Sequence, residues 1–413
     1  MHLIHWTEAE TARTALWHAE NGMAAPKRAV VADDTLGADV AYRLACEGTA
    51  LIWRGDFQNA RQLLQALARR ADRKPAKARR AGAAGAAAAR KAGSTPKDQF
   101  NLHRQAQSQR ARLLAMLLIP LSADYSIPLR RAPDWRQACT EAYGAPQSHE
   151  GDGSGDAMVS LRELLGLVGA HEWRKKGVEV PALGPAPGNR IHPHYGVFSP
   201  VRGEYLALVA DTPLPACLGA VPGRPFAATV FDIGTGTGVL SALLARRGAS
   251  HVVATDMDPR ALACAAENLA RLGCANAVQV IAADLFPPLK AHGLAGLIVC
   301  NPPWLPARPS SRLEHAVYDP DSGMLRGFLA GLAAHLAPGG EGWLILSDLA
   351  EHLGLRTRAE LLDHIAASGL QVLGRSDVRP LHRKATDPDD PLHAARAAEV
   401  TSLWRLGAGA AVH

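Results

Sequence analysis

The sequence has no CxxC pair, no long apolar run and few aromatic residues. Its six cysteines are scattered, so neither a zinc site nor a disulfide framework is indicated. A reduced, cytoplasmic protein is the simplest interpretation. No apolar run reaches about 18 residues, so no membrane span is expected. The first ten residues lack a basic head followed by an apolar stretch, which predicts no signal peptide.

Acidic residues are scarce in one stretch, from Arg69 to Arg112. Thirteen Lys and Arg residues stand there against Asp72 and Asp98, whereas the whole chain carries a net charge of only +6. Residues 71–100 are dominated by Ala, Gly, Lys and Arg without apolar periodicity, which predicts a flexible or partly helical basic linker. Such a tract can neutralise nucleic-acid phosphates. The alternative is a solvated linker, since no aromatic residue within 71–99 offers a stacking surface.

The apolar content of 47% and the length of 413 residues are sufficient for two or three packed domains. Residues 29–70 alternate two short apolar runs with two helical patterns, which predicts a small β-α-β-α element. From residue 226 onward, apolar strands and amphipathic helices alternate regularly to the end of the chain. This pattern predicts a doubly wound, mainly parallel sheet. In such sheets ligands bind beyond the carboxyl ends of the strands.

The first strand of this C-terminal region ends in the sequence FDIGTGTG. Gly234, Gly236 and Gly238 permit a tight turn and a close approach of a ligand to a helix that follows directly. A GxGxG pattern serves several nucleotide-type cofactors. Asp232, before the first glycine, would be unusual beside a pyrophosphate and suits a ligand that carries an ammonium group.

The next two strands also end in acidic residues. Asp256 stands where a carboxylate can accept hydrogen bonds from both hydroxyls of a ribose. Asp258, just before Pro259, is the better candidate for the helix N-cap, which leaves Asp256 free for a ligand. Asp284, in AADLF, could accept a hydrogen bond from an adenine amine.

The fourth strand ends in Asn301, Pro302, Pro303 and Trp304. Two consecutive prolines cannot continue a buried strand and are incompatible with the interior of a helix. They therefore fix a rigid turn that presents the amide of Asn301 and the indole of Trp304. Four neighbouring strand ends thus carry ligand-type residues, which independent turns would rarely produce.

In this order, DIGTGTG, ATDMDPRALACAAENL, AADLF and NPPW resemble the class I S-adenosylmethionine-dependent methyltransferases over residues 226–347. The NPPW motif is similar to that of the branch that methylates planar nitrogen. This branch includes release-factor glutamine methyltransferases and the adenine and guanine amino-methyltransferases of DNA and RNA. The segments FSPVRGEYLALVA and YDPDSGMLRGFL also look like parts of the glutamine enzymes, which extends the resemblance to about residues 155–406. The first 150 residues only faintly resemble the N-terminal half of two-domain rRNA guanine methyltransferases.

The resemblance implies S-adenosylmethionine as the cofactor and a methyl acceptor bound at the NPPW motif. The acceptor nitrogen is a poor nucleophile because its lone pair is delocalised. The side-chain carbonyl of Asn301 and the backbone carbonyl of Pro302 can accept its two N–H groups, while Pro303 helps to hold that geometry. Trp304 can stack on the planar acceptor group.

Together these observations predict an α/β protein with a Rossmann-like, seven-stranded methyltransferase domain at its C-terminus. We expect an accessory α/β or mostly helical region at 1–70, the basic linker at 71–112, a helical connecting region at 113–180 and the methyltransferase domain at 181–413. The acceptor is either a protein, such as a release factor or ribosomal protein, or RNA or DNA. A non-catalytic binding module on a retained methyltransferase fold is the alternative. His192 and His194 have metal-like spacing, but no Cys or acid accompanies them, so no metal is predicted.

Overall fold

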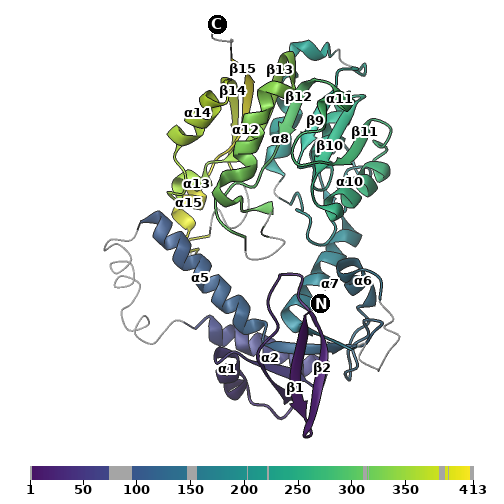
Figure 1. The fold of residues 1–413 in the computed structure, drawn as a ribbon, viewed down its shortest axis with the longest axis vertical. Helices are drawn as coiled ribbons and strands as arrows, with labels where there is room; N and C mark the ends of the chain where they lie inside the picture. The colour runs from purple at the N-terminus through teal and green to yellow at the C-terminus, as the bar shows by residue number, and fades with distance from the viewer. Residues whose placement is uncertain are drawn as a thin grey trace. The chain divides into compact units, whose positions relative to one another are not determined.

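A computed structural model describes residues 2–73, 95–146, 156–201, 203–220, 223–309, 314, 316–380, 387–388 and 390–409. The chain divides into two compact units, Met1–Glu172 and Trp173–His413. Figure 1 shows the first unit in purple and blue and the second in teal, green and yellow.

The first unit is built on a six-stranded sheet. Its strand order is β1-β2-β6-β5-β4-β3. Strands β3, β4 and β5 are parallel, β6 is antiparallel to β5, and β1 and β2 form an antiparallel hairpin. The strands are β1 Leu3–Glu8, β2 Thr11–His18, β3 Arg28–Ala32, β4 Thr49–Trp53, β5 Leu117–Leu121 and β6 Ala157–Ser160.

The described residues of this unit also form the helices α1 Ala38–Cys46, α2 Phe57–Ala71, α5 Pro96–Leu114, α6 Arg136–Tyr143 and α7 Leu161–Lys176, the last of which continues into the second unit. The predicted β-α-β-α element is confirmed, since β3, α1, β4 and α2 follow one another in that order. Asp56 is the N-cap of α2, and its side chain accepts the backbone N–H of Gln58 and so satisfies a donor at the helix start.

The boundaries expected for this part of the chain differ from the structure. The predicted segments 1–70, 71–112 and 113–180 do not divide the fold, because β5 and β6 complete the sheet that β3 and β4 begin. Short apolar runs such as LLIPL do not reveal whether they are strand or helix, and β1 and β2 were not expected at all. Within the predicted linker, residues 95–112 belong to α5 and its N-cap Thr95, whereas residues 74–94 lie outside the described residues.

The second unit contains the predicted seven-stranded sheet. Its order is β11-β10-β9-β12-β13-β15-β14, and β15 runs in the direction opposite to the other six strands. The strands are β9 Val230–Ile233, β10 Val252–Asp256, β11 Val278–Ala282, β12 Ala295–Cys300, β13 Leu336–Ser347, β14 Leu370–Val378 and β15 Thr401–Ala408. A short antiparallel pair, β7 Val178–Glu179 and β8 Arg190–Ile191, precedes them.

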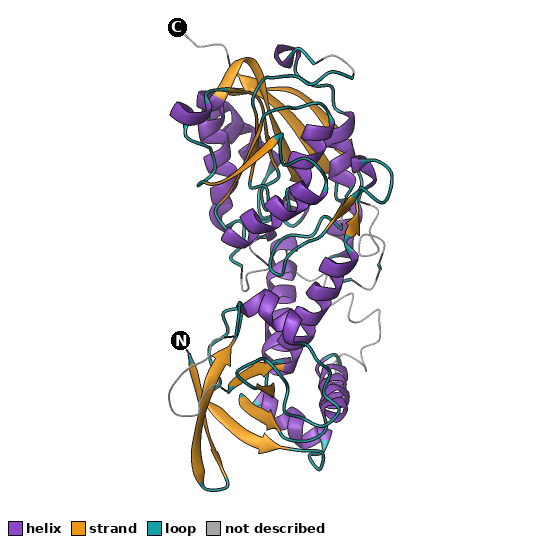
Figure 2. Ribbon diagram, turned by 90° about the vertical axis from the view of Figure 1, so that its right-hand side faces the viewer, coloured by secondary structure: helices purple, strands orange, loops and turns teal. Residues whose placement is uncertain are grey.

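Helices cover both faces of this sheet, as Figure 2 shows. Helices α8, α9 and α10 contribute to the apolar cluster on one face, and α12 and α14 to the cluster on the other. The helices are α8 Glu204–Asp211, α9 Val239–Arg246, α10 Pro259–Arg271, α11 Leu289–His292, α12 Gly323–His335, α13 Leu349–His352, α14 Arg358–Ala367 and α15 His393–Ala398. Across the described ranges, no helix combines the length and apolar character that a membrane span needs.

Candidate active site

Three adjacent strands of the second sheet end level with one another. Ile233 at the end of β9 pairs with Thr255 of β10 on one side and with Cys300 of β12 on the other. The next residue along each strand is therefore Gly234, Asp256 or Asn301. The parallel register alone thus brings the glycine loop, the second acid and the NPPW motif to one edge of the sheet.

The glycine loop joins β9 to α9, and glycine is needed at Gly236 and at Gly238 for different structural reasons. Gly236 has φ +55°, and a Cβ built there would meet nothing within 4 Å, so the loop faces open space at this point. Gly238 has φ +78°, and a Cβ there would lie 3.1 Å from the Cα of Ala265 in α10. Gly238 therefore allows close packing of the loop on α10, while Gly236 leaves room for a ligand.

Asp232 is fully buried in β9 and has one carboxylate oxygen to spare. Its Oδ2 accepts hydrogen bonds from the Thr235 hydroxyl at 2.7 Å and from the Ser241 hydroxyl and backbone N–H at 2.6 and 3.0 Å. Its Oδ1 is buried with no hydrogen-bond partner among the described residues. Burial raises the pKa of Asp232. An unsatisfied buried acceptor is costly, so this oxygen suits a donor from a bound ligand.

Asp256 ends β10 and is tied to the glycine loop. Its Oδ2 accepts the backbone N–H of Gly236 at 3.0 Å, and its Oδ1 accepts that of Asp258 at 3.0 Å. Asp258 itself caps α10 through the N–H of Arg260, which confirms the predicted N-cap, while the ribose contact of Asp256 stays a prediction. Burial is the main cause that raises the pKa of Asp256.

Asp284 follows β11 at the same edge of the sheet and is exposed. Strand β11 is parallel to β10, with Ala282 opposite Asp256. The fold therefore places Asp284 beyond the carboxyl end of its strand, as the sequence predicts. Its contact with an adenine amine stays a prediction.

Asn301 is held by two aromatic side chains. The indole N–H of Trp304 donates a hydrogen bond to Asn301 Oδ1 at 3.0 Å. The Asn301 side chain also interacts with the hydroxyl of Tyr205, a buried residue of α8. The Trp304 ring also packs against the apolar clusters on both faces of the sheet. Trp304 thus positions Asn301, and its stacking on an acceptor stays a prediction.

The segment after the NPPW motif closes back on the strand end. The backbone N–H of Asp319 donates to the carbonyl of Leu305 at 2.8 Å. The buried carboxylate of Asp319 accepts the N–H groups of Met324 and Leu325, which satisfies donors at the start of α12. Sequence reasoning noted the segments of Tyr205 and Asp319 but assigned no role to either residue.

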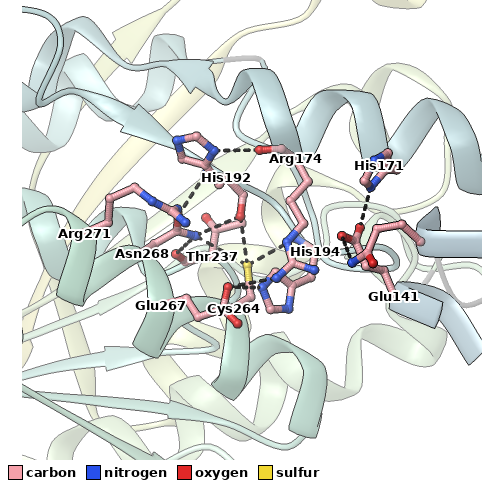
Figure 3. A network of polar contacts seen from close by, with 11 residues as sticks. Glu141, His171, Arg174, His192, His194, Thr237, Cys264, Glu267, Asn268 and Arg271 are labelled. Carbon is pink, nitrogen blue, oxygen red and sulfur yellow. Dashed lines mark hydrogen bonds and ion pairs between the residues drawn. The ribbon is translucent and has the colours of Figure 1, made fainter. Parts of the chain in front are cut away.

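A polar network fastens the segment before α8 to α10 (Figure 3). The buried Asn268 of α10 accepts the backbone N–H of His192 at 2.8 Å and donates to the carbonyls of His192 and Thr237. His194 pairs with Glu267 at 2.9 Å. Within the described ranges, no group of three His, Cys, Asp or Glu side chains could hold a metal ion. Both histidines therefore help to anchor the chain that leads to Tyr205.

The sheet has seven strands in this order, and adjacent strand ends carry a glycine loop, an acid placed to bind a ribose, and an NPPW motif. These features together define the class I S-adenosylmethionine-dependent methyltransferases. The sequence pattern of the family called Methyltransferase small domain matches residues 217–358. This stretch includes the glycine loop, the three acids Asp232, Asp256 and Asp284, and the NPPW motif.

Curated relatives of this chain include two kinds of protein methyltransferase. A release factor glutamine methyltransferase of Gloeobacter violaceus is 32% identical over 207 residues, which are 46% of this chain and 68% of that protein. One of Cereibacter sphaeroides is 35% identical over 204 residues, 45% of this chain and 66% of that protein. A ribosomal protein L11 methyltransferase of Pelotomaculum thermopropionicum is 49% identical over 73 residues, 18% of this chain and 23% of that protein.

The chain belongs to the release factor glutamine methyltransferase family of class I S-adenosylmethionine-dependent methyltransferases. It spans less than two thirds of the length of the Cereibacter and Pelotomaculum proteins.

Proposed function

We propose that this protein transfers a methyl group from S-adenosylmethionine to the side-chain amide nitrogen of a glutamine in a protein. The observation that carries the proposal is Asn301, held by the Trp304 indole at the strand end beside the glycine loop. The names of the relatives favour a protein acceptor, since they refer to release factors and to ribosomal protein L11.

The residues at the edge of the sheet fit the cofactor. The spare oxygen of Asp232 suits the ammonium group of its methionine part, and Asp256 suits its ribose. The open space at Gly236 permits close approach of the backbone, and Asp284 would receive the adenine amine. When bound, S-adenosylmethionine supplies a methyl group on a positively charged sulfur.

The chain's own contribution to the chemistry is orientation. An oxygen such as Asn301 Oδ1 has two lone pairs, and Trp304 uses one of them. The other can accept an N–H of the acceptor amide, while the carbonyl of Pro302 accepts the second N–H. Holding both N–H groups directs the nitrogen lone pair toward the methyl donor. A strong general base is not required, because the proton becomes acidic once the methyl group is attached.

A nucleobase amine presents the same planar NH₂ group and is the alternative acceptor. The basic segment from Arg69 to Arg112 supports it. In the described part of that segment, however, Arg70 pairs with Asp39 and Arg110 with Asp72. These ion pairs occupy two of the cations that would otherwise contact phosphate.

The proposal is tested by transfer of tritiated methyl groups into a cell lysate whose protein and RNA fractions are then separated. We expect label in protein that is recovered as N-methylglutamine after hydrolysis. Asn301→Ala should lower the rate by about 100-fold or more and leave cofactor binding by calorimetry unchanged. Asn276→Ala, at an exposed asparagine of the same unit, is the matched control.

Label in RNA that is lost in Asn301→Ala would replace the protein acceptor with a base amine. Cofactor binding without label in either fraction would favour the non-catalytic binding module.

A further inference from the structure

Arg356 is a buried residue in which two guanidinium nitrogens have no hydrogen-bond partner in the described part of the chain. It lies on the loop between α13 and α14 and is only 7% exposed. Its Nε and Nη2 atoms are both buried, and neither has a hydrogen-bond partner among the described residues. Burial lowers the pKa of the Arg356 guanidinium. A buried charge that is neither paired nor hydrogen-bonded costs stability, so its retention calls for a functional reason.

Nearby carboxylates act on Arg356 without binding it. Glu351, Asp319 and Glu360 all exert an electrostatic effect on its guanidinium. In the part of the chain that the structure describes, however, none of them forms an ion pair with Arg356 within 4.0 Å. The three carboxylates thus interact with the Arg356 guanidinium electrostatically but do not form ion pairs with it.

Each of these three carboxylates is already bound elsewhere. Both oxygens of Glu351 accept hydrogen bonds from Arg358, at 2.8 and 3.0 Å. The oxygens of Asp319 accept backbone N–H groups at the start of α12. Glu360 accepts from the backbone and hydroxyl of Thr357 at the start of α14. The fold therefore uses its nearby acids for other tasks and leaves Arg356 available.

Other arginines of this chain show what the Nε and Nη2 pair binds. In four of them, Nε and Nη2 donate to the two oxygens of one carboxylate, at distances between 2.6 and 3.0 Å. The pairs are Arg54 with Glu8, Arg110 with Asp72, Arg136 with Asp134, and Arg405 with Glu341. This two-point geometry is the preferred way for a guanidinium to hold a carboxylate. Arg356 offers the same pair of donors with no acceptor.

The position of Arg356 points to the acceptor rather than the cofactor. Its loop follows β13, which lies beside β12 on the side away from β9 and β10. Asp319, whose charge acts on Arg356, is bonded through its backbone to Leu305, the residue after Trp304. Arg356 therefore lies on a loop that comes after the strand next to β12, and β12 is the strand that ends at the NPPW motif.

We propose that Arg356 binds a carboxylate of the acceptor protein through Nε and Nη2 and so positions the chain that carries the methylated amide. The assignment to the acceptor rests on the proposed function. A protein offers such carboxylates on Asp and Glu side chains and at its C-terminus. The bound carboxylate would supply the missing hydrogen-bond partners and the neutralising charge.

The carboxylate site is tested directly with acetate as the probe, without any methyl transfer. The thermal unfolding midpoint of the full chain is measured in sodium acetate and in sodium chloride of equal ionic strength. We expect acetate to raise the midpoint of the wild type by about 2–5 °C. The rise should vanish in Arg356→Met and shrink in Arg356→Lys, which keeps the charge but not the two-point geometry. Arg326→Met, at an exposed arginine of α12, should respond like the wild type.

The same measurement contains outcomes that would overturn the proposal. In chloride, Arg356→Met should be at least as stable as the wild type, because it removes a buried unpaired charge. A clear loss of stability would make Arg356 a structural residue. An acetate effect that is absent in the wild type, or retained in Arg356→Met, would sink the carboxylate site. A shift with inorganic phosphate but not with acetate would replace the carboxylate with a phosphate ligand.

Kinetics with the labelled protein fraction then test the link to the acceptor. Arg356→Met should raise the acceptor KM by about tenfold or more, with kcat and cofactor affinity within about twofold of the wild type. An unchanged KM would separate Arg356 from acceptor binding. If the wild type shows no methyl transfer at all, the proposed function fails, while the acetate measurement still decides whether Arg356 is a carboxylate site.

Discussion

The side chain of Asn301 is oriented by a hydrogen bond from the indole N–H of Trp304. We predict that Trp304→Phe, which keeps an aromatic ring but loses the indole N–H, lowers kcat by about 3- to 10-fold, as expected for the loss of one hydrogen bond. Cofactor affinity should not change, because Trp304 is not among the residues assigned to the cofactor. Steady-state methyl transfer and calorimetry measure the two quantities. A full kcat in Trp304→Phe would show that the indole N–H does not position Asn301.

The raised pKa of Asp232 predicts how cofactor affinity depends on pH. The ionised carboxylate is the form that suits an ammonium group, so affinity should fall as pH drops through the raised pKa values of Asp232 and Asp256. For stability the sign is opposite. A carboxyl group whose folded pKa is raised contributes stability at low pH, which is lost as pH rises through that pKa. The ionised form of Asp232 therefore destabilises the folded protein.

Asp232→Asn separates these two effects. The variant should bind the cofactor about tenfold or more weakly at neutral pH, with less dependence on pH, and be at least as stable as the wild type without ligand. Calorimetry and thermal unfolding between pH 5 and pH 8 test this. An affinity equal to that of the wild type would remove Asp232 from the cofactor site.

Residues at strand ends could be predicted from the sequence because their position depends only on the local pattern and on the parallel register. Asp232, Asp256 and Asn301 were found in this way. Tyr205 and Arg356 were not, because their roles depend on contacts with residues roughly 40 to 100 positions away in the chain, or on the absence of such contacts. No local spacing encodes either property.

At the scale of elements, the turn between β9 and α9 makes a paired prediction. Both Gly236 and Gly238 have positive φ, so alanine strains the backbone at either position. Only at Gly238 would the added Cβ also press against the backbone of Ala265, at 3.1 Å. We predict that Gly238→Ala lowers the free energy of unfolding by about 2 kcal/mol or more and Gly236→Ala by about 1 kcal/mol.

For cofactor affinity we expect the opposite order: relative to its loss of stability, Gly236→Ala should weaken binding more than Gly238→Ala. Gly236→Ala fills the open space beside the loop and should weaken cofactor affinity by about tenfold or more, although it remains well folded. Denaturant unfolding and calorimetry on both variants provide the test. Equal stability losses with unchanged affinity in Gly236→Ala would mean that the cofactor does not approach the loop at this residue.

Long alternating patterns made the second sheet predictable, whereas isolated short runs did not. The segments from 226 onward contain repeated strand and helix signals, and each supports the assignment of its neighbours. Strand β6, with the four residues AMVS, runs directly into α7 and lies within the region 113–180 that the sequence predicts to be helical. Strands of the first sheet are joined through distant pairings such as β2 with β6, which no local pattern reveals.

At the scale of the whole molecule, the two units have separate sheets and separate apolar clusters. Every residue assigned here to the cofactor or to the acceptor amide belongs to Trp173–His413. A fragment of residues 166–413 would retain the last turns of α7, where Arg174 pairs with Glu267 and accepts a hydrogen bond at its carbonyl from His192. This fragment therefore contains a complete sheet and the complete site.

We predict that the fragment unfolds cooperatively and binds S-adenosylmethionine within about threefold of the full chain. If the first unit recruits the acceptor, methylation of protein in a lysate should fall by about tenfold or more, and the loss should appear in KM rather than kcat. Calorimetry, thermal unfolding and methyl transfer on fragment and full chain measure these effects. Unchanged methylation would leave the first unit without a part in acceptor binding, and a fragment that fails to fold would show that the second unit depends on the first for its stability.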